Sequence, residues 1–177
     1  MKKVIIEENY TIIRRHTIEL LFLRHGIAEE RPVKGNRDAD RALTEEGIHS
    51  IKVSARGMRR LGIQLDHLVS SPLTRAVQTA EIVGRTLGLR PRVEAALAPG
   101  FDISQLRRLL ADYSAEAQVM FVGHEPDLST LVAILTDGGQ IMMKKGGLAL
   151  VSLPHIDSLD GSLRYLLPPK VLRALGE

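Results

Sequence analysis

The chain contains, at residues 20–26, the stretch Leu20-Leu21-Phe22-Leu23-Arg24-His25-Gly26, in which four apolar residues precede a charged pair and a glycine. A short apolar run that ends at turn residues is typical of a strand buried on both faces of a sheet. We therefore predict a buried strand over residues 20–23 that opens into a loop at Arg24.

Further stretches along the chain repeat this pattern and alternate with helical periodicity. Strands are predicted at residues 65–71, which stop at Pro72, and at residues 119–122, which Gly123 ends. A short strand is predicted at residues 92–96, and two more at 148–153 and 163–167. Apolar residues at helical spacing predict a helix over residues 44–61, with Thr44 as its N-cap, and a second helix from after Pro72 to Leu87, which Gly88 ends. Three more helices are predicted over residues 103–112, 127–135 and 170–175.

The alternation of strands and helices predicts an α/β fold with a mostly parallel central sheet. The last two strands follow one another without a helix between them, so we expect them to form an antiparallel edge. The length of 177 residues fits one domain, 1–177. Residues 1–17 are a terminal extension of unclear role, in which residues 4–6 and 10–13 could form a short hairpin or an added edge strand.

Composition excludes several classes of protein. The 44% hydrophobic and 25% charged residues are ordinary for a globular chain, which excludes disorder and coiled coils. The chain has no cysteine, so disulfides, thiolate metal sites and a cysteine nucleophile are excluded. A net charge of +3 with 3% aromatic residues argues against nucleic-acid binding. No apolar run approaches the roughly 18 residues of a membrane span, so we expect a cytoplasmic protein with no membrane association.

Two histidines and two arginines follow the ends of three predicted strands. Arg24 and His25 follow the first strand, Arg75 follows the second, and His124 follows the strand at residues 119–122. Ligands of open α/β sheets bind at the carboxyl ends of the strands, so these four side chains should meet there. Any one of them alone could be structural, but four at one sheet edge favour a common site.

These residue types suit phosphoryl transfer. Arginine pairs bidentately with phosphate oxygens and keeps its charge. A neutral imidazole can attack phosphorus and hold the phosphoryl group covalently. Helix N-termini after Pro72 and Pro126 would add backbone N–H donors to the same anion.

Three segments resemble the histidine phosphatase superfamily, which includes phosphoglycerate mutases and acid phosphatases. They are the Leu23-Arg24-His25-Gly26 stretch, residues 70–80 around Arg75, and Val122-Gly123-His124-Glu125-Pro126, and they occur in family order. Residues 40–47, the small size and the short interval between Arg75 and His124 resemble the SixA-type phosphohistidine phosphatases. The resemblance covers residues 19 to about 167 and implies a three-layer α/β/α fold like that of phosphoglycerate mutase.

The resemblance also implies a role for each residue. His25 would be the catalytic nucleophile, Arg24 and Arg75 would clamp the phosphoryl group, and His124 would hydrogen bond to or charge-stabilise the same oxygens. No metal or organic cofactor is expected. The expected partner is a phosphorylated histidine-containing protein, such as a signalling phosphotransfer domain, or a small phosphorylated substrate.

Mutase-like members place a glutamate as general acid between the second arginine segment and the second histidine. Here Leu97-Ala98-Pro99 occupies that neighbourhood, and Glu94 and Asp102 are the nearby carboxylates that could serve. We favour an exposed strand position for Glu94 and a helix cap for Asp102. A phosphohistidine leaves as imidazole, which needs less help from an acid than an alkoxide does.

The leading function is therefore a protein-histidine phosphatase, a phosphoric hydrolase that works through phosphorylated His25. The alternatives are a general small-molecule phosphomonoesterase of the same superfamily, which Glu94 or Asp102 in the pocket would favour, and a non-catalytic phosphate-binding module. A mutase fits less well, because it must retain the phosphoryl group in a closed pocket.

Overall fold

A computed structural model describes residues 17–30, 37–155 and 160–177. The hairpin or added edge strand considered at residues 4–6 and 10–13 lies outside the described residues. The elements in chain order are β1 (Ile18–Arg24), η1 (Asp38–Asp40), α1 (Glu45–Arg60), β2 (His67–Ser70), α2 (Thr74–Leu87), β3 (Arg92–Val93), η2 (Ala95–Leu97), α3 (Ile103–Leu110), β4 (Gln118–Gly123), α4 (Asp127–Leu135), β5 (Leu148–Leu153), β6 (Ser162–Leu167) and α5 (Pro169–Gly176).

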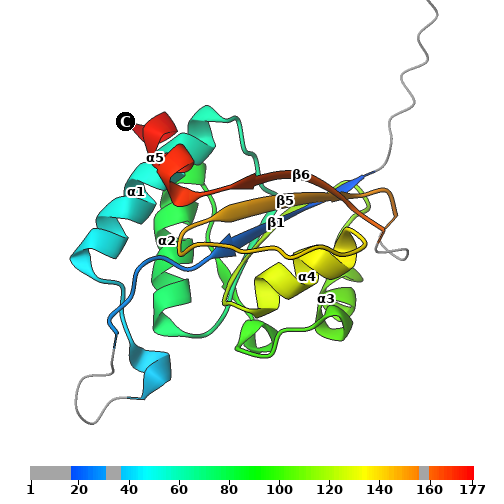
Figure 1. Ribbon diagram of the computed structural model, residues 1–177, viewed down its shortest axis with the longest axis horizontal. Helices are drawn as coiled ribbons and strands as arrows, with labels where there is room; N and C mark the ends of the chain where they lie inside the picture. The colour runs from blue at the N-terminus through cyan, green and yellow to red at the C-terminus, as the bar shows by residue number, and fades with distance from the viewer. Residues whose placement is uncertain (1–16, 31–36, 156–159) are drawn as a thin grey trace, which may run out of the picture.

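The strands form one mixed sheet in the order β3-β2-β4-β1-β5-β6 (Figure 1). The first four strands of that order run parallel, while β5 pairs antiparallel with β1 and β6 antiparallel with β5. The predicted parallel sheet with an antiparallel edge is confirmed.

Helices cover both faces of the sheet and make three layers (Figure 1). Alternate residues of β1 divide between two cores. Leu20 and Phe22 pack with apolar residues of α3 and α4, whereas Leu21 and Leu23 pack with those of α1, α2 and α5. All four side chains are at most 1% exposed, which is why the strand reads as a continuous apolar run.

Two predicted helix ends are confirmed in detail. The Thr44 side chain accepts a hydrogen bond from the Gly47 amide at 3.0 Å and so caps α1. Gly88 ends α2 in the left-handed conformation, with φ at 82°, where glycine carries no steric penalty.

The structure differs from the sequence prediction in two places that matter for the site. The strand expected at residues 92–96 ends at Val93, because the chain then coils into η2 and buries Leu97 in the core. The loop after β1 contains the short helix η1, which Asp40 stabilises by accepting a hydrogen bond from the Arg37 amide at 3.1 Å. In addition, α3 ends at Leu110 rather than at residue 112.

None of the helices in the described residues is long and apolar enough to cross a bilayer.

Candidate functional site

Sheet register brings the two site histidines together. Arg24 of β1 pairs with Gly123 of β4, and the His25 amide donates to the Gly123 carbonyl oxygen at 3.1 Å. The chain therefore leaves both strands at the same level, and the rings of His25 and His124 lie 5.2 Å apart between centroids. The predicted convergence of strand ends is present for these residues.

The environment of His25 keeps its imidazole neutral. The side chain is buried, and Nδ1 lies 2.8 Å from the Gly26 carbonyl oxygen. Because a carbonyl oxygen only accepts, Nδ1 carries the proton and Nε2 holds the lone pair. The pKa of His25 is lowered to about 3, with burial as the largest cause; the hydrogen bond to the Gly26 carbonyl opposes this effect, and the nearby positive charges, among them those of Arg75 and Arg24, add to it.

The backbone after His25 is tied to α2. The Gly26 amide donates to the Thr79 hydroxyl oxygen at 3.1 Å, and that hydroxyl donates to the Arg75 carbonyl oxygen at 2.7 Å. Thr79 is fully buried. One threonine therefore joins the loop that carries His25 to the helix turn that carries Arg75.

Arg75 enters the site from the first turn of α2. Its side chain is 8% exposed, and its positive charge lowers the pKa of both His25 and His124. Its terminal nitrogens bond to Asp38: Nη1 donates to the backbone carbonyl oxygen at 2.9 Å, and Nη2 donates to Oδ2 at 3.1 Å.

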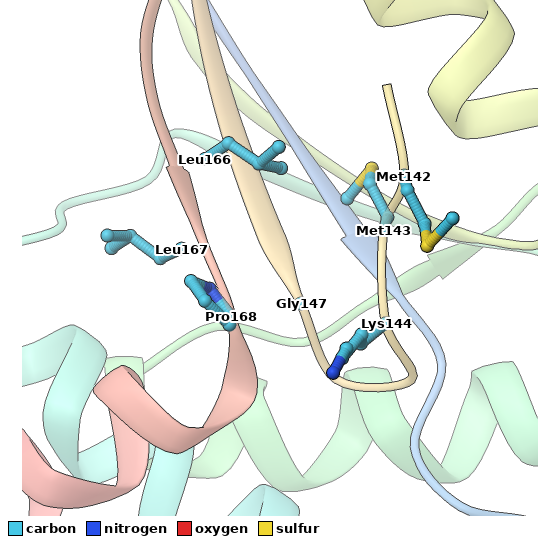
Figure 2. A pocket seen from close by; sticks show the side chains of 7 residues that line it. All are labelled: Met142, Met143, Lys144, Gly147, Leu166, Leu167 and Pro168. Carbon is cyan, nitrogen blue, oxygen red and sulfur yellow. The ribbon is translucent and has the colours of Figure 1, made fainter. Parts of the chain in front are cut away.

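Arg24 is fixed by the loop before β5. Its Nη1 donates to the Met143 carbonyl oxygen at 2.7 Å, and the Gly146 amide lies 3.1 Å from the carbonyl oxygens of Arg24 and His25. Figure 2 shows Met142, Met143 and Lys144 on this loop, beside the end of β1. Burial lowers the pKa of Arg24, while the charge of Glu125 opposes that effect.

His124 is held by Ser71, the residue that follows β2. Nε2 of His124 lies 2.7 Å from the Ser71 hydroxyl oxygen, and both residues are buried. Burial lowers the pKa of His124 to about 4, and the charge of Arg75 adds to this effect, so the ring is neutral near pH 7.

Two donor atoms of this cluster are buried without a hydrogen-bond partner among the described residues. They are Nε of Arg24 and Nδ1 of His124, the latter being a donor when its ring carries the proton there. A buried donor without an acceptor costs about 1–3 kcal/mol, so such atoms are uncommon outside ligand sites. Both belong to residues that the sequence places in the site.

Neither carboxylate considered as a general acid contacts these four residues in the hydrogen bonds and ion pairs of the described chain. Asp102 caps α3, with Oδ1 accepting from the Gln105 amide at 2.8 Å, as favoured from the sequence. Glu94 was expected at an exposed strand position, but it follows the end of β3 as the N-cap residue of η2, its side chain is only 29% exposed, and its carboxylate lies 4.0 Å from Arg92. A catalytic role for either residue stays a prediction.

Other carboxylates act on the site and were missed by the sequence analysis. Asp38 bonds to Arg75, and the charges of Asp38 and Asp127 raise the pKa of His124 against its burial. Glu125 acts on Arg24. Glu125 and Asp127 lie within three residues of His124, and this proximity in sequence could have identified them. Asp38 lies in a distant loop, where no sequence pattern indicates its contact with Arg75.

The assembled group can hold a compact anion. Two guanidinium groups and two neutral imidazoles line one end of the sheet, and a tetrahedral oxyanion accepts hydrogen bonds of the kind that they donate. Within the described chain, no group of three histidine or acidic side chains could hold a metal ion.

Comparisons with known proteins agree with this geometry. Residues 20–99 match the sequence model of the histidine phosphatase superfamily, branch 1. An uncharacterized protein of Picosynechococcus sp. is 36% identical over 137 residues, which cover 74% of this chain and 82% of that protein. The phosphohistidine phosphatase SixA of Escherichia coli K12 is 27% identical over 156 residues, or 86% of this chain and 94% of SixA.

The fold is also similar to solved structures. A protein histidine phosphatase SixA in complex with tungstate superimposes with a TM-score of 0.75 at 27% identity, covering 86% of this chain and 97% of that one.

Proposed function

The chain belongs to the histidine phosphatase superfamily, as its three sequence segments predicted, and from this premise we propose that it hydrolyses phosphohistidine on a protein through a phosphorylated His25. The family match and the similarity to SixA together support phosphatase chemistry. The identity of the substrate and the roles of the individual residues are our proposal.

In the first step, Nε2 of His25 attacks the phosphorus atom of the substrate. The Gly26 carbonyl holds the proton on Nδ1, so the attacking nitrogen carries a lone pair without a prior proton transfer. The new Nε2–P bond forms as the P–N bond of the substrate breaks, and the substrate histidine, which already carries a proton on its other ring nitrogen, leaves as neutral imidazole. Water then attacks the phosphoryl group on His25 and releases inorganic phosphate, which restores the neutral imidazole.

The observation that carries the proposal is the pair of buried donors without partners around His25. We assign Nε of Arg24 and Nδ1 of His124 to oxygens of the phosphoryl group. For His124 this requires that the Ser71 hydroxyl donate to Nε2, which leaves the proton on Nδ1. Arg75 would add further N–H donors, and fixed donors of this kind stabilise the charge that spreads over the equatorial oxygens in the transition state.

Phosphohistidine fits the site better than a phosphate ester does. Glu94 and Asp102 make no described contact with the four site residues, and Asp102 is already used as a helix cap. An alkoxide leaving group needs a proton from a positioned acid, whereas imidazole is a much better leaving group. The relatedness to SixA, whose name specifies a phosphohistidine phosphatase, supports the same choice.

The surface beside Arg24 suits a protein substrate. Met142 is 79% exposed, and Lys144 and Lys145 are also exposed, on the loop whose Met143 carbonyl bonds to Arg24. Met142 borders a hollow of about 150 Å³ that Leu166, Leu167 and Pro168 line on the other side (Figure 2). An exposed apolar side chain beside two positive charges fits an acidic partner with an apolar contact, since methionine adapts to varied surfaces.

The experiment compares a phosphorylated histidine-containing phosphotransfer protein with p-nitrophenyl phosphate as substrates. We expect faster release of phosphate from the phosphoprotein and an acid-labile phosphoenzyme in rapid-quench samples. The phosphoenzyme should be absent in His25→Ala and present in His49→Ala, a matched exposed histidine on α1.

Efficient hydrolysis of p-nitrophenyl phosphate without action on phosphohistidine would instead identify a small-molecule phosphomonoesterase. Binding of phosphate without turnover of either substrate would identify a non-catalytic module.

A further inference from the structure

An exposed carboxylate contacts the most deeply placed arginine of the site. Asp38 lies in η1, and its side chain is 61% exposed, while the Arg75 side chain that it bonds is 8% exposed. The contact joins residues 37 positions apart and uses both the carboxylate and the backbone carbonyl of Asp38. The sequence analysis assigned Arg75 to the phosphoryl group and named no carboxylate partner for it.

The geometry leaves part of the guanidinium free. A guanidinium has five N–H donors in a rigid fork. Asp38 accepts one from Nη1 and one from Nη2, so three donors, including the one on Nε, have no hydrogen-bond partner among the contacts of residues 17–30, 37–155 and 160–177. The positive charge of the same guanidinium also lowers the pKa of His25 and of His124. Three free donors suffice for a bidentate contact with a phosphoryl group.

A second arginine neutralises the carboxylate. Nη1 of Arg41 donates to Oδ1 of Asp38 at 2.8 Å, and Nε of Arg41 donates to the Glu29 carbonyl oxygen at 2.5 Å. Oδ1 and Oδ2 are therefore shared between two arginines, and the group of three carries a net charge of +1. An incoming phosphoryl group meets this net positive charge, so Asp38 need not leave for it to bind.

The loop that carries Asp38 and Arg41 is anchored to the segment that follows His25. The Glu29 amide donates to the Ala42 carbonyl oxygen at 3.0 Å, and Ala28 and Leu43 form a β-bridge. Asp38 is thereby held relative to the segment that follows His25. This connection gives the carboxylate a defined position from which to orient Arg75.

We propose that Asp38 is a positioning residue for Arg75, holding the end of its guanidinium so that the remaining donors face the phosphoryl group, and that Arg41 holds Asp38 in turn. The inference rests on the proposed phosphoryl site at His25 and adds two residues that act through Arg75. Asp38 itself contacts no reacting atom.

The test measures tungstate binding by calorimetry, together with kcat and KM for p-nitrophenyl phosphate. Asp38→Ala should weaken tungstate binding and lower kcat/KM, each by about 10- to 100-fold, the range for losing a charged hydrogen-bond partner. Asp38→Asn keeps an acceptor oxygen and should fall between wild type and Asp38→Ala. Arg41→Met should cause a smaller loss than Asp38→Ala.

Asp40→Ala is the matched control. Asp40 lies in the same short helix but bonds only to Arg37 in the described contacts, so its loss should change tungstate affinity by less than about threefold. An equal loss in Asp38→Ala and Asp40→Ala would overturn the proposal, since loop integrity alone would explain both. Unchanged or tighter tungstate binding in Asp38→Ala would also overturn it, because the carboxylate would then compete with the anion.

A double-variant cycle tests whether Asp38 acts through Arg75. In an Arg75→Ala background, adding Asp38→Ala should leave kcat/KM unchanged within about twofold, whereas independent roles would give additive losses. Failure of the substrate proposal is distinguishable: wild type would bind tungstate, and Asp38→Ala would weaken that binding, even if phosphohistidine were not hydrolysed. Wild type that bound no tungstate would contradict the phosphoryl site and the inference together.

Discussion

Nδ1 of His25 lies 2.8 Å from the carbonyl oxygen of Gly26, the next residue in the chain. The contact assigns the proton to Nδ1 and leaves Nε2 with its lone pair, as the proposed attack on phosphorus requires. It is made by the backbone, so it does not depend on any other side chain. Two predictions about protonation follow from this contact and from the burial of the two rings.

The first prediction concerns the ionisation of the two site histidines. Because burial lowers the pKa of His25 to about 3 and that of His124 to about 4, neither ring should titrate between pH 8 and 5. NMR of the imidazole nitrogens should report an unprotonated Nε2 in His25 across that range. His25→Asn and His124→Asn assign the signals, and a midpoint near 6.5 for either ring would contradict the prediction.

The second prediction concerns stability. Both histidines have a lower pKa in the folded protein than the usual 6.5, so the unfolded chain binds more protons below that value. Their contribution is therefore complete above pH 6.5 and is lost as the pH falls toward 4 and 3. Each histidine should remove up to about 1.4 kcal/mol of unfolding free energy per pH unit in that window.

Urea denaturation at pH 7 and pH 5 measures this loss. Carboxylates also begin to titrate at pH 5, so the control is the double variant His25→Gln, His124→Gln, which should lose less stability than wild type over the same interval. Equal losses in the two proteins would mean that the rings are protonated in the folded state.

Much of the site could be predicted because it follows from strand ends. The strands at residues 20–23 and 119–122 are buried on both faces, so they can be recognised in the sequence as continuous apolar runs. Parallel pairing of β1 with β4 then requires the residues after each strand to meet at one edge. The meeting of His25 and His124 was thus implied by the sequence before any contact was known.

Asp38 could not be predicted by this reasoning. Its contact with Arg75 depends on the path of a loop, and loop paths have no periodicity to interpret. The strand predicted at residues 92–96 proved too long for a related reason. In the described part of the chain β3 is an edge strand that pairs with β2 alone, so the packing of Leu97 in the core decided where the strand ended.

A third prediction tests the buried hydroxyl of Thr79. Thr79→Val keeps the shape of the side chain but leaves the Gly26 amide without its acceptor, which should cost about 1–3 kcal/mol of unfolding free energy. The same change should lower kcat/KM, because the Gly26 amide holds the backbone beside His25. Chemical denaturation and steady-state kinetics measure the two effects.

Two controls accompany Thr79→Val. Thr79→Ser retains the hydroxyl and should recover most of the activity. Thr86→Val removes a hydroxyl of α2 that donates only to the Ile82 carbonyl oxygen in the described contacts, so it should leave kcat/KM unchanged. If Thr79→Val and Thr86→Val had the same effect on kcat/KM, Thr79 would have no special link to His25.

A fourth prediction tests whether the loop beside Arg24 recognises a protein. Met142→Glu places a negative charge where an acidic partner is proposed to dock, and it should lower kcat/KM for a phosphohistidine protein by about 10-fold or more, the loss typical of a central interface contact. Hydrolysis of p-nitrophenyl phosphate should change by less than about twofold, because we propose this surface as a contact for a protein partner and not for the phosphoryl group.

The matched control is Leu61→Glu, an apolar-to-acidic change at another exposed position, directly after α1. It should leave both activities unchanged. Raising the salt concentration should weaken wild-type action on the phosphoprotein more than action on the small substrate, since Lys144 and Lys145 attract an acidic partner through screened charges. If Met142→Glu lowered both activities equally, the substitution would be acting on Arg24 through the Met143 carbonyl rather than on partner recognition.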